Sequence, residues 1–213
     1  MVELQYFGNS FFKIKNKKDS ILIDPIYKSK VKKSDIDDAS IILLTNETEE
    51  HFDKALIESV VSNGKVKVVA HDSILRQLNL PRTQKVSIGI DSEIFLNNFK
   101  IKTTTAHYPQ SFYPMGYLID CDGKKIYHAG ITSLIDTFSK IRPDVALLPM
   151  NNRSMDIIDV VRAAKMMKPK KLVPMHCDAK DFRNSSIDLK KRIEESVLNT
   201  ETIILLPGRK MRV

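Results

Sequence analysis

The chain has 213 residues, of which 42% are apolar and 28% are charged, and its formal net charge is +8. This composition is typical of a soluble globular protein, and the length is sufficient to bury a sizeable core. No apolar run approaches the roughly 18 residues of a membrane span, which excludes the transmembrane class. The two cysteines, Cys121 and Cys177, form no disulfide framework, and residues 1–12 lack a signal-peptide pattern, so we expect a cytoplasmic protein without a membrane partner.

The excess of basic residues is spread along the chain. Lysines occur in short groups at residues 13–18, 28–33, 168–171 and 190–191, and aromatic residues are not interleaved with them as in nucleic-acid stacking platforms. We therefore expect these lysines in solvated turns and at helix ends. Nucleic-acid binding stays open as an alternative, which would require a single basic face and a steep loss of affinity with salt.

Short strand-like segments fill the first third of the chain. Runs rich in β-branched and aromatic residues alternate with Gly, Asn, Lys and Asp, which predicts strands at residues 2–7, 10–15 and 20–25. The apolar run at 41–45 has the length of a buried strand, and a helix is expected from His51 to Ser62. A strand at 65–70 and a helix at 72–80 follow.

The middle of the chain is again rich in strands, and the last third alternates strands with helices. A hairpin is expected at Asp122-Gly123, because this pair suits positive φ. The pattern predicts a single domain, residues 1–213, in which stacked sheets are covered by outer helices. The expected strands are 93–97, 99–106, 116–121, 124–129, 144–150, 171–175 and 202–207, and the expected helices are 155–167 and 187–198.

Three of the five histidines directly follow predicted strands or their loops. These are His51, His107 and His176. Loops at one edge of stacked sheets are where α/β proteins keep their sites, so these three side chains could converge. His71 opens a predicted helix and His128 precedes a glycine turn, and a histidine in such a place is more often a satisfied polar residue than a ligand.

Seven segments of the chain occur in an order and spacing that one family shares. They are YFGNSFFKI, ILIDP, ASIILLTNETEEHFD, TTTAHYPQS, GYLIDCDGKKIYHAGIT, IRPDVALLPMNNR and KLVPMHCDAKDF. On these segments the chain resembles the metallo-β-lactamase fold superfamily, nearest to its ascorbate-6-phosphate lactonase-like branch. The resemblance implies an α/β fold of the αββα sandwich type, with two mixed β-sheets packed face to face and helices outside. It specifies the fold more strongly than the activity, because function depends on the site.

The metal-binding motif of this family is altered in the chain. The family pattern is Thr-His-x-His-x-Asp-His, whereas residues 45–51 read Thr-Asn-Glu-Thr-Glu-Glu-His. Asn46 and Thr48 replace two histidines, Glu50 replaces the aspartate, and Ile131 replaces the aspartate that bridges the metals in Gly-Asp-Thr. Only His51 remains in this motif. His107 and His176 match the two other family histidines.

By this resemblance, Asn46, Thr48 and His107 would hold the first metal. An amide oxygen and a hydroxyl are weak ligands for zinc or manganese, so we expect this position to be empty. The second metal would take Glu50, His51 and His176. Two histidines and a carboxylate make a workable catalytic set with positions left for water. The expected cofactor is therefore none or one divalent metal, zinc or manganese.

Other residues match positions around the family site. Asp24 is expected to hydrogen-bond the backbone of the metal-binding loop, and His128 is placed with it as a supporting residue. Arg153 suits a bidentate grip on phosphate or carboxylate, with a loop cap or salt bridge as the alternative. Asn152 and Tyr108 are further candidates for the wall of a substrate pocket.

Two functional hypotheses rest on these residues. In the first, the protein has lost the two-metal centre and is a weak or inactive hydrolase relative that binds a small anionic molecule or a partner. In the second, it is a single-metal hydrolase of a lactone or phosphorylated sugar ester that uses Glu50, His51 and His176. The sequence leaves the substrate and the oligomeric state open, a homo-oligomer included.

Overall fold

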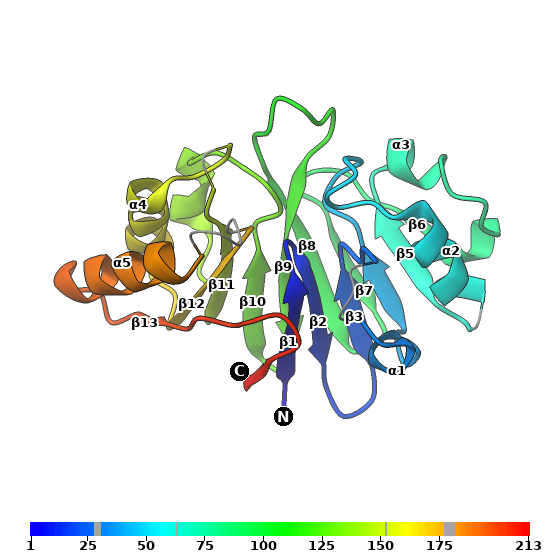
Figure 1. The fold of residues 1–213 in the computed structure, drawn as a ribbon. Coiled ribbons are helices and arrows are strands. Elements are labelled where there is room, and N and C mark those ends of the chain that lie inside the picture. The colour runs from blue at the N-terminus through cyan, green and yellow to red at the C-terminus, as the bar shows by residue number, and fades with distance from the viewer. Residues whose placement is uncertain (28–30, 63, 152, 177–181) are drawn as a thin grey trace.

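Two seven-stranded mixed β-sheets pack face to face at the centre of the computed structural model, which describes residues 1–27, 31–62, 64–151, 153–176 and 182–213 (Figure 1). The first sheet has the strand order β14-β1-β2-β3-β4-β5-β6. Its strands are β1 (Glu3–Gly8), β2 (Phe11–Lys15), β3 (Ser20–Ile23), β4 (Ile41–Leu43), β5 (Lys67–Ala70), β6 (Lys85–Ser87) and β14 (Lys210–Arg212).

The second sheet has the order β13-β12-β11-β10-β9-β8-β7. The hairpin between β9 and β10 is confirmed, because Asp122 and Gly123 both have positive φ and Cys121 pairs with Lys124. The strands of this sheet are β7 (Glu93–Leu96), β8 (Phe99–Thr105), β9 (Met115–Cys121), β10 (Lys124–His128), β11 (Val145–Pro149), β12 (Lys171–Met175) and β13 (Glu201–Thr202).

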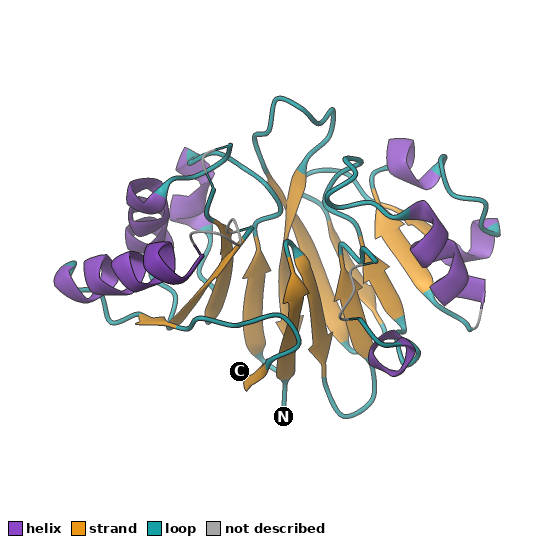
Figure 2. Cartoon of the chain, in the orientation of Figure 1, coloured by secondary structure: helices purple, strands orange, loops and turns teal. Residues whose placement is uncertain are grey.

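Helices cover the outer faces of the two sheets in two separate groups (Figure 2). They are α1 (Lys33–Ile36), α2 (Lys54–Ser62) and α3 (Asp72–Leu75) on one side, and α4 (Ile157–Met167) and α5 (Phe182–Glu195) on the other, with 3-10 turns at Arg82–Gln84 and Asp136–Lys140. The predicted αββα sandwich of two mixed sheets with outer helices is therefore confirmed. Within the described residues, no helix has both the length and the apolar character needed to cross a membrane.

Two apolar clusters fill the spaces between these layers. Ile21 and Ile23 of β3 belong to the larger cluster, which lies between the sheets and extends under α4 and α5. Leu22, between them in sequence, points the other way into a second cluster with residues of α1, α2 and α3. Successive side chains of a strand face opposite sides, so one fully buried strand contributes to both clusters. This explains why β3 and β4 are continuous apolar runs.

Some predicted elements differ from the observed ones. The helix expected at 72–80 is only α3, four residues long, and α5 begins five residues before the expected start at 187. The strand expected at 202–207 is confined to Glu201–Thr202, because the chain then leaves the sheet and places Leu205 in the core. The short strands β6 and β14 were not expected, since they are three residues long and largely polar.

Gly116 in β9 is the glycine with the least room for a side chain. A Cβ atom at Gly116 would lie 2.7 Å from Thr104 Oγ1, 2.9 Å from Tyr127 Oη and 3.0 Å from the His128 carbonyl oxygen. We expect Gly116→Ala to lower the free energy of unfolding by about 1–3 kcal/mol through overpacking. Urea denaturation followed by circular dichroism would measure it.

Gly64→Ala is the matched control, because the nearest atom to its added Cβ is 3.9 Å away. We expect the control to change the free energy of unfolding by at most about 0.5 kcal/mol. Equal effects of the two substitutions would contradict the close packing described for β9.

Candidate functional site

The candidate site lies at the edge where the parallel strands of both sheets end. Strands β3 to β6 are mutually parallel, as are β10 to β13, so their carboxyl ends gather at one edge of the sandwich. Asp24 directly follows β3, the loop of residues 45–51 follows β4, and His176 directly follows β12. Side chains more than 100 positions apart in the sequence are thereby brought together.

Asp24 is the buried centre of this edge. Its Oδ1 accepts a hydrogen bond from the Thr45 backbone N–H at 2.8 Å, and its Oδ2 accepts one from the Thr45 hydroxyl at 2.7 Å. The same Oδ2 lies 2.6 Å from Nδ1 of His51, and the Asp24 and His51 side chains are fully buried. Asp24 has φ 48°, a left-handed conformation that Asp tolerates better than most residues. The carboxylate therefore fixes both the start of the 45–51 loop and the ring at its end.

His51 and His176 form a pair. Their ring centroids are 4.7 Å apart with an interplanar angle of 35°, and His176 is almost completely buried. Because Asp24 accepts the proton on Nδ1, the Nε2 atom of a neutral His51 ring carries the lone pair. This buried Nε2 has no hydrogen-bond partner among the described residues. A carboxylate on one ring nitrogen and an open second nitrogen is the arrangement of a metal-binding histidine.

Asn46 and Thr48, near the start of the 45–51 loop, bond to each other. Asn46 Oδ1 accepts hydrogen bonds from the Thr48 backbone N–H at 2.9 Å and from the Thr48 hydroxyl at 2.6 Å. Its amide nitrogen donates to Thr45 Oγ1 at 3.2 Å. Asn46 is buried, so these bonds satisfy polar groups that would otherwise be costly. The amide is thus a structural brace of the loop.

Glu50 turns toward Arg153 at the surface. Glu50 Oε1 lies 3.3 Å from Arg153 Nη1, and the two side chains are 46% and 67% exposed. Tyr108 lies close by, since the negative charge of Glu50 adds to the rise in the Tyr108 pKa that burial causes, and the Arg153 charge opposes it. Among the described residues, no group of three His, Cys, Asp or Glu side chains is placed to hold a metal ion. The structure thus brings His51 and His176 together. The Glu50 side chain, predicted to be the third ligand, is paired with Arg153 instead.

The two other predicted histidines have different surroundings. His107 is exposed, and its backbone N–H donates to Thr132 Oγ1 at 2.9 Å. His128 is buried, its Nε2 donates to the Ser10 carbonyl at 2.8 Å, and its Nδ1 accepts from the Gly130 N–H. Burial lowers the His128 pKa. Both ring nitrogens of His128 are used, so this residue supports the strand ends next to the site.

Two residues singled out in the sequence, Asn152 and Cys177, lie outside the described residues. Glu47 was not identified from the sequence, yet its carboxylate accepts hydrogen bonds from Ser111 Oγ at 2.8 Å and from the Phe112 N–H at 2.7 Å. Nothing in the local sequence marks it, because its partners are more than 60 positions away.

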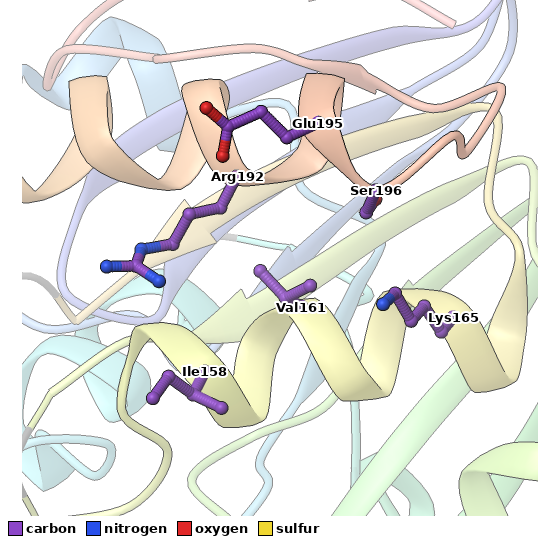
Figure 3. Close-up of a pocket in the computed structure, with 6 residues that line it drawn as sticks. All are labelled: Ile158, Val161, Lys165, Arg192, Glu195 and Ser196. Atoms are coloured by element: carbon purple, nitrogen blue, oxygen red, sulfur yellow. The ribbon is translucent and has the colours of Figure 1, made fainter.

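A hollow of about 250 Å³ lies between α4 and α5 (Figure 3). None of the described residues that line it was predicted to form the site. Ile158, Val161 and Lys165 line it from α4, and charged residues of α5 face them. It is therefore a surface groove separate from the histidine pair. Among the described residues, the lining consists of Ile158, Val161, Lys165, Arg192, Glu195 and Ser196.

Known proteins are similar to this chain in sequence and in fold over most of its length. A family model described as a beta-lactamase superfamily domain matches residues 3–176. The chain is 28% identical to a UPF0173 metal-dependent hydrolase of Methanosphaera stadtmanae, covering 99% of each protein, and 31% identical to one of Thermoplasma volcanium, covering 84% of this chain and 85% of the relative. It is also similar to the structure of Igni18, a metallo hydrolase of Ignicoccus hospitalis, with a TM-score of 0.83, 26% identity and coverage of 99% and 97%.

The hydrogen bonds of Asp24 predict the effect of Asp24→Asn on His51. The amide keeps one acceptor for the Thr45 N–H but presents a donor toward His51, so we expect the His51 ring proton to move from Nδ1 to Nε2. The free energy of unfolding should fall by about 1–3 kcal/mol. Long-range ¹⁵N NMR of the histidine rings would report the tautomer, and urea denaturation the stability.

Asp91→Asn is the control for this substitution, because Asp91 also has a positive φ, 55°, but is exposed. We expect it to change neither the His51 tautomer nor, beyond about 0.5 kcal/mol, the stability. A His51 proton that stays on Nδ1 in Asp24→Asn would contradict the role assigned to the carboxylate.

Proposed function

The chain belongs to the metallo-β-lactamase superfamily, in the UPF0173 family of metal-dependent hydrolases, and from this premise we propose that it is a hydrolase with a single divalent metal. In this proposal His51 and His176 hold the metal, zinc or manganese, and the substrate is an ester or lactone that carries an anionic group. A phosphorylated sugar ester of the lactonase type is one substrate of this class. In this proposal the first metal position, at Asn46, Thr48 and His107, stays empty.

The proposal depends on one observation: Nε2 of the buried His51 ring has no hydrogen-bond partner among the described residues. A buried polar atom without a partner costs about 1–3 kcal/mol, so a fold keeps it only where something else compensates. A metal ion bound between His51 and His176 would satisfy this nitrogen. The Asp24 carboxylate on the opposite side of the ring is the support that metal-binding histidines commonly have.

The residues fit one metal better than two. Asn46 Oδ1 is already occupied by both donors of Thr48, and Ile131 supplies an apolar side chain where a bridging carboxylate would be needed. Glu50 could join the two histidines by leaving Arg153. An exposed ion pair is worth at most about 1 kcal/mol, so this exchange costs little.

A divalent metal would supply a Lewis acid that lowers the pKa of water to about 7 and polarises a carbonyl or phosphoryl oxygen. The residues of the chain would do the positioning. Asp24 holds the His51 ring in one tautomer and orientation. Arg153, once released by Glu50, would bind the anionic group of the substrate with its planar guanidinium. Tyr108, buried beside this pair, would close one wall.

A second candidate function is a metal-free protein that binds a small anionic molecule through Arg153. The bonds between Asn46 and Thr48 favour it, because they engage both side chains within the loop. This candidate has the same anion-binding residue and lacks the hydrolytic step. The metal content of the purified protein separates the two.

We expect elemental analysis to find about one equivalent of metal per chain in protein purified without chelator, with zinc, manganese and iron supplied in the growth medium. His51→Ala should lose this metal, because it removes the nitrogen held in place by Asp24. His71→Gln is the control and should keep it, since His71 caps α3 with its own Nδ1. A folded wild-type protein without metal would reject the single-metal proposal and favour the second candidate.

The ion pair of Glu50 and Arg153 gives a separate prediction. Arg153→Ala should raise the KM for an anionic ester by roughly tenfold or more, because the substitution removes a charge-assisted contact. The KM for a neutral ester should stay unchanged. The affinity for metal should stay the same or increase, since Glu50 is released. Steady-state kinetics and isothermal titration with zinc would measure both.

Arg162→Ala is the matched control, because Arg162 is exposed to a similar extent and also pairs with one carboxylate, that of Asp159. We expect Arg162→Ala to change neither the KM for the anionic ester nor the affinity for metal. An equal rise in KM for anionic and neutral esters in Arg153→Ala would argue against an anion-binding role.

A further inference from the structure

The loop between β8 and β9, residues 106–114, rises above the edge of the sheets where the strands end (Figure 1). Phe112 on this loop is 87% exposed, more than any other aromatic side chain of the described residues. A single exposed aromatic residue needs no explanation by itself. The way in which this loop is fastened is what makes Phe112 distinct.

Glu47 fastens the loop with both of its carboxylate oxygens. Oε2 accepts a hydrogen bond from the Ser111 hydroxyl at 2.8 Å, and Oε1 accepts one from the Phe112 backbone N–H at 2.7 Å. Hydrogen bonds to an ionised carboxylate are about twice as strong as those between neutral groups. The bond to the N–H of Phe112 itself restrains the backbone that carries the exposed ring.

A ring contact holds the loop from a second direction. The Tyr113 ring stacks on His71 with a centroid distance of 3.9 Å and an interplanar angle of 20°. His71 directly follows β5 of the first sheet, whereas the loop joins β8 and β9 of the second sheet. The loop therefore bridges the two sheets at the site edge, with Phe112 next to Tyr113 in sequence and left in solvent.

The loop is continuous with the candidate site. Glu47 stands between Asn46 and Thr48 in the segment that ends at His51. At the base of the loop, the Met115 N–H donates to the Thr45 carbonyl at 3.0 Å. Tyr108, on the rising side, is buried near the charges of Glu50 and Arg153. An apolar group attached to a substrate in the site would have this loop as a neighbouring wall.

We propose that residues 108–113 form a specificity loop, in which Phe112 contacts an apolar or aromatic group of the substrate and Glu47 acts as the positioning residue. The inference rests on the proposed function and narrows its substrate class. The preferred substrate is an ester with an anionic group for Arg153 on one part and an aromatic or branched apolar group on the other. Burial of a Phe side chain against such a group accounts for roughly a tenfold preference over a methyl group.

Phe112→Ala tests the contact directly. We expect the KM for a phenylacetyl ester to rise about tenfold with little change in kcat, while the KM for the corresponding acetyl ester stays the same. Phe95→Ala is the matched control, because Phe95 is also largely exposed, at 74%, but lies on the edge strand β7. Equal losses for both esters, or the same loss in Phe95→Ala, would overturn the inference.

Glu47→Gln tests the positioning role. A neutral amide cannot accept both hydrogen bonds with the strength of a carboxylate. We therefore expect the KM for the phenylacetyl ester to rise, by less than in Phe112→Ala, and hydrogen exchange at the Phe112 amide to become faster. The urea midpoint should change little, since both bonds lie in a surface loop. Glu49→Gln, an exposed neighbour in the same segment, is the control. An unchanged exchange rate at Phe112 in Glu47→Gln would reject the role of Glu47.

A binding measurement separates this inference from the proposed function. If no ester is hydrolysed, the proposed hydrolase function fails, and NMR titration with phenylphosphonate and methylphosphonate still tests the loop. We expect tighter binding of phenylphosphonate and loss of that preference in Phe112→Ala. Equal binding of the two phosphonates would overturn the inference. So would a dimer that Phe112→Ala converts to a monomer, because a second copy of the chain would then be what covers the ring.

Discussion

The buried carboxylate of Asp24 is the interaction on which the site edge depends. A carboxylate taken out of water costs several kcal/mol unless its lone pairs are satisfied, and here three donors from Thr45 and His51 satisfy them. The pairing of β3 with β4 places Asp24 beside Thr45, because the Asp24 N–H itself donates to the Leu43 carbonyl. The geometry of the sheet thus dictates where the His51 ring must lie.

The loop after β4 is held in shape by hydrogen bonds of its own side chains. Asn46 and Thr48 bond to each other, Glu47 holds the loop of residues 108–113, and His51 is held by Asp24. Each of these four side chains therefore has a hydrogen-bond partner within the protein. These bonds restrain the backbone of the segment locally.

The sequence predicted the site residues whose positions follow from the ends of strands. It did not predict the side-chain contacts made with residues far away in the sequence. His51 and His176 could be expected to meet because parallel strands end at one edge, and the buried runs at β3 and β4 were recognisable. The direction of Glu50 could not be predicted, since a long flexible side chain took a partner 103 positions away. The role of Glu47 was missed for the same reason. β14 escaped notice because only its pairing with β1 makes it a strand.

The separation of the apolar clusters from the polar edge has a consequence for metal dependence. The large cluster between the sheets is built from apolar side chains, and neither it nor the smaller cluster includes Asp24, His51 or His176. Burial of apolar surface is the dominant favourable term in folding, and both clusters are built from side chains of the chain itself. A metal that binds the folded state alone would stabilise it by mass action, in proportion to ion concentration and affinity. The stabilisation from a bound metal would therefore add to that from the two apolar clusters.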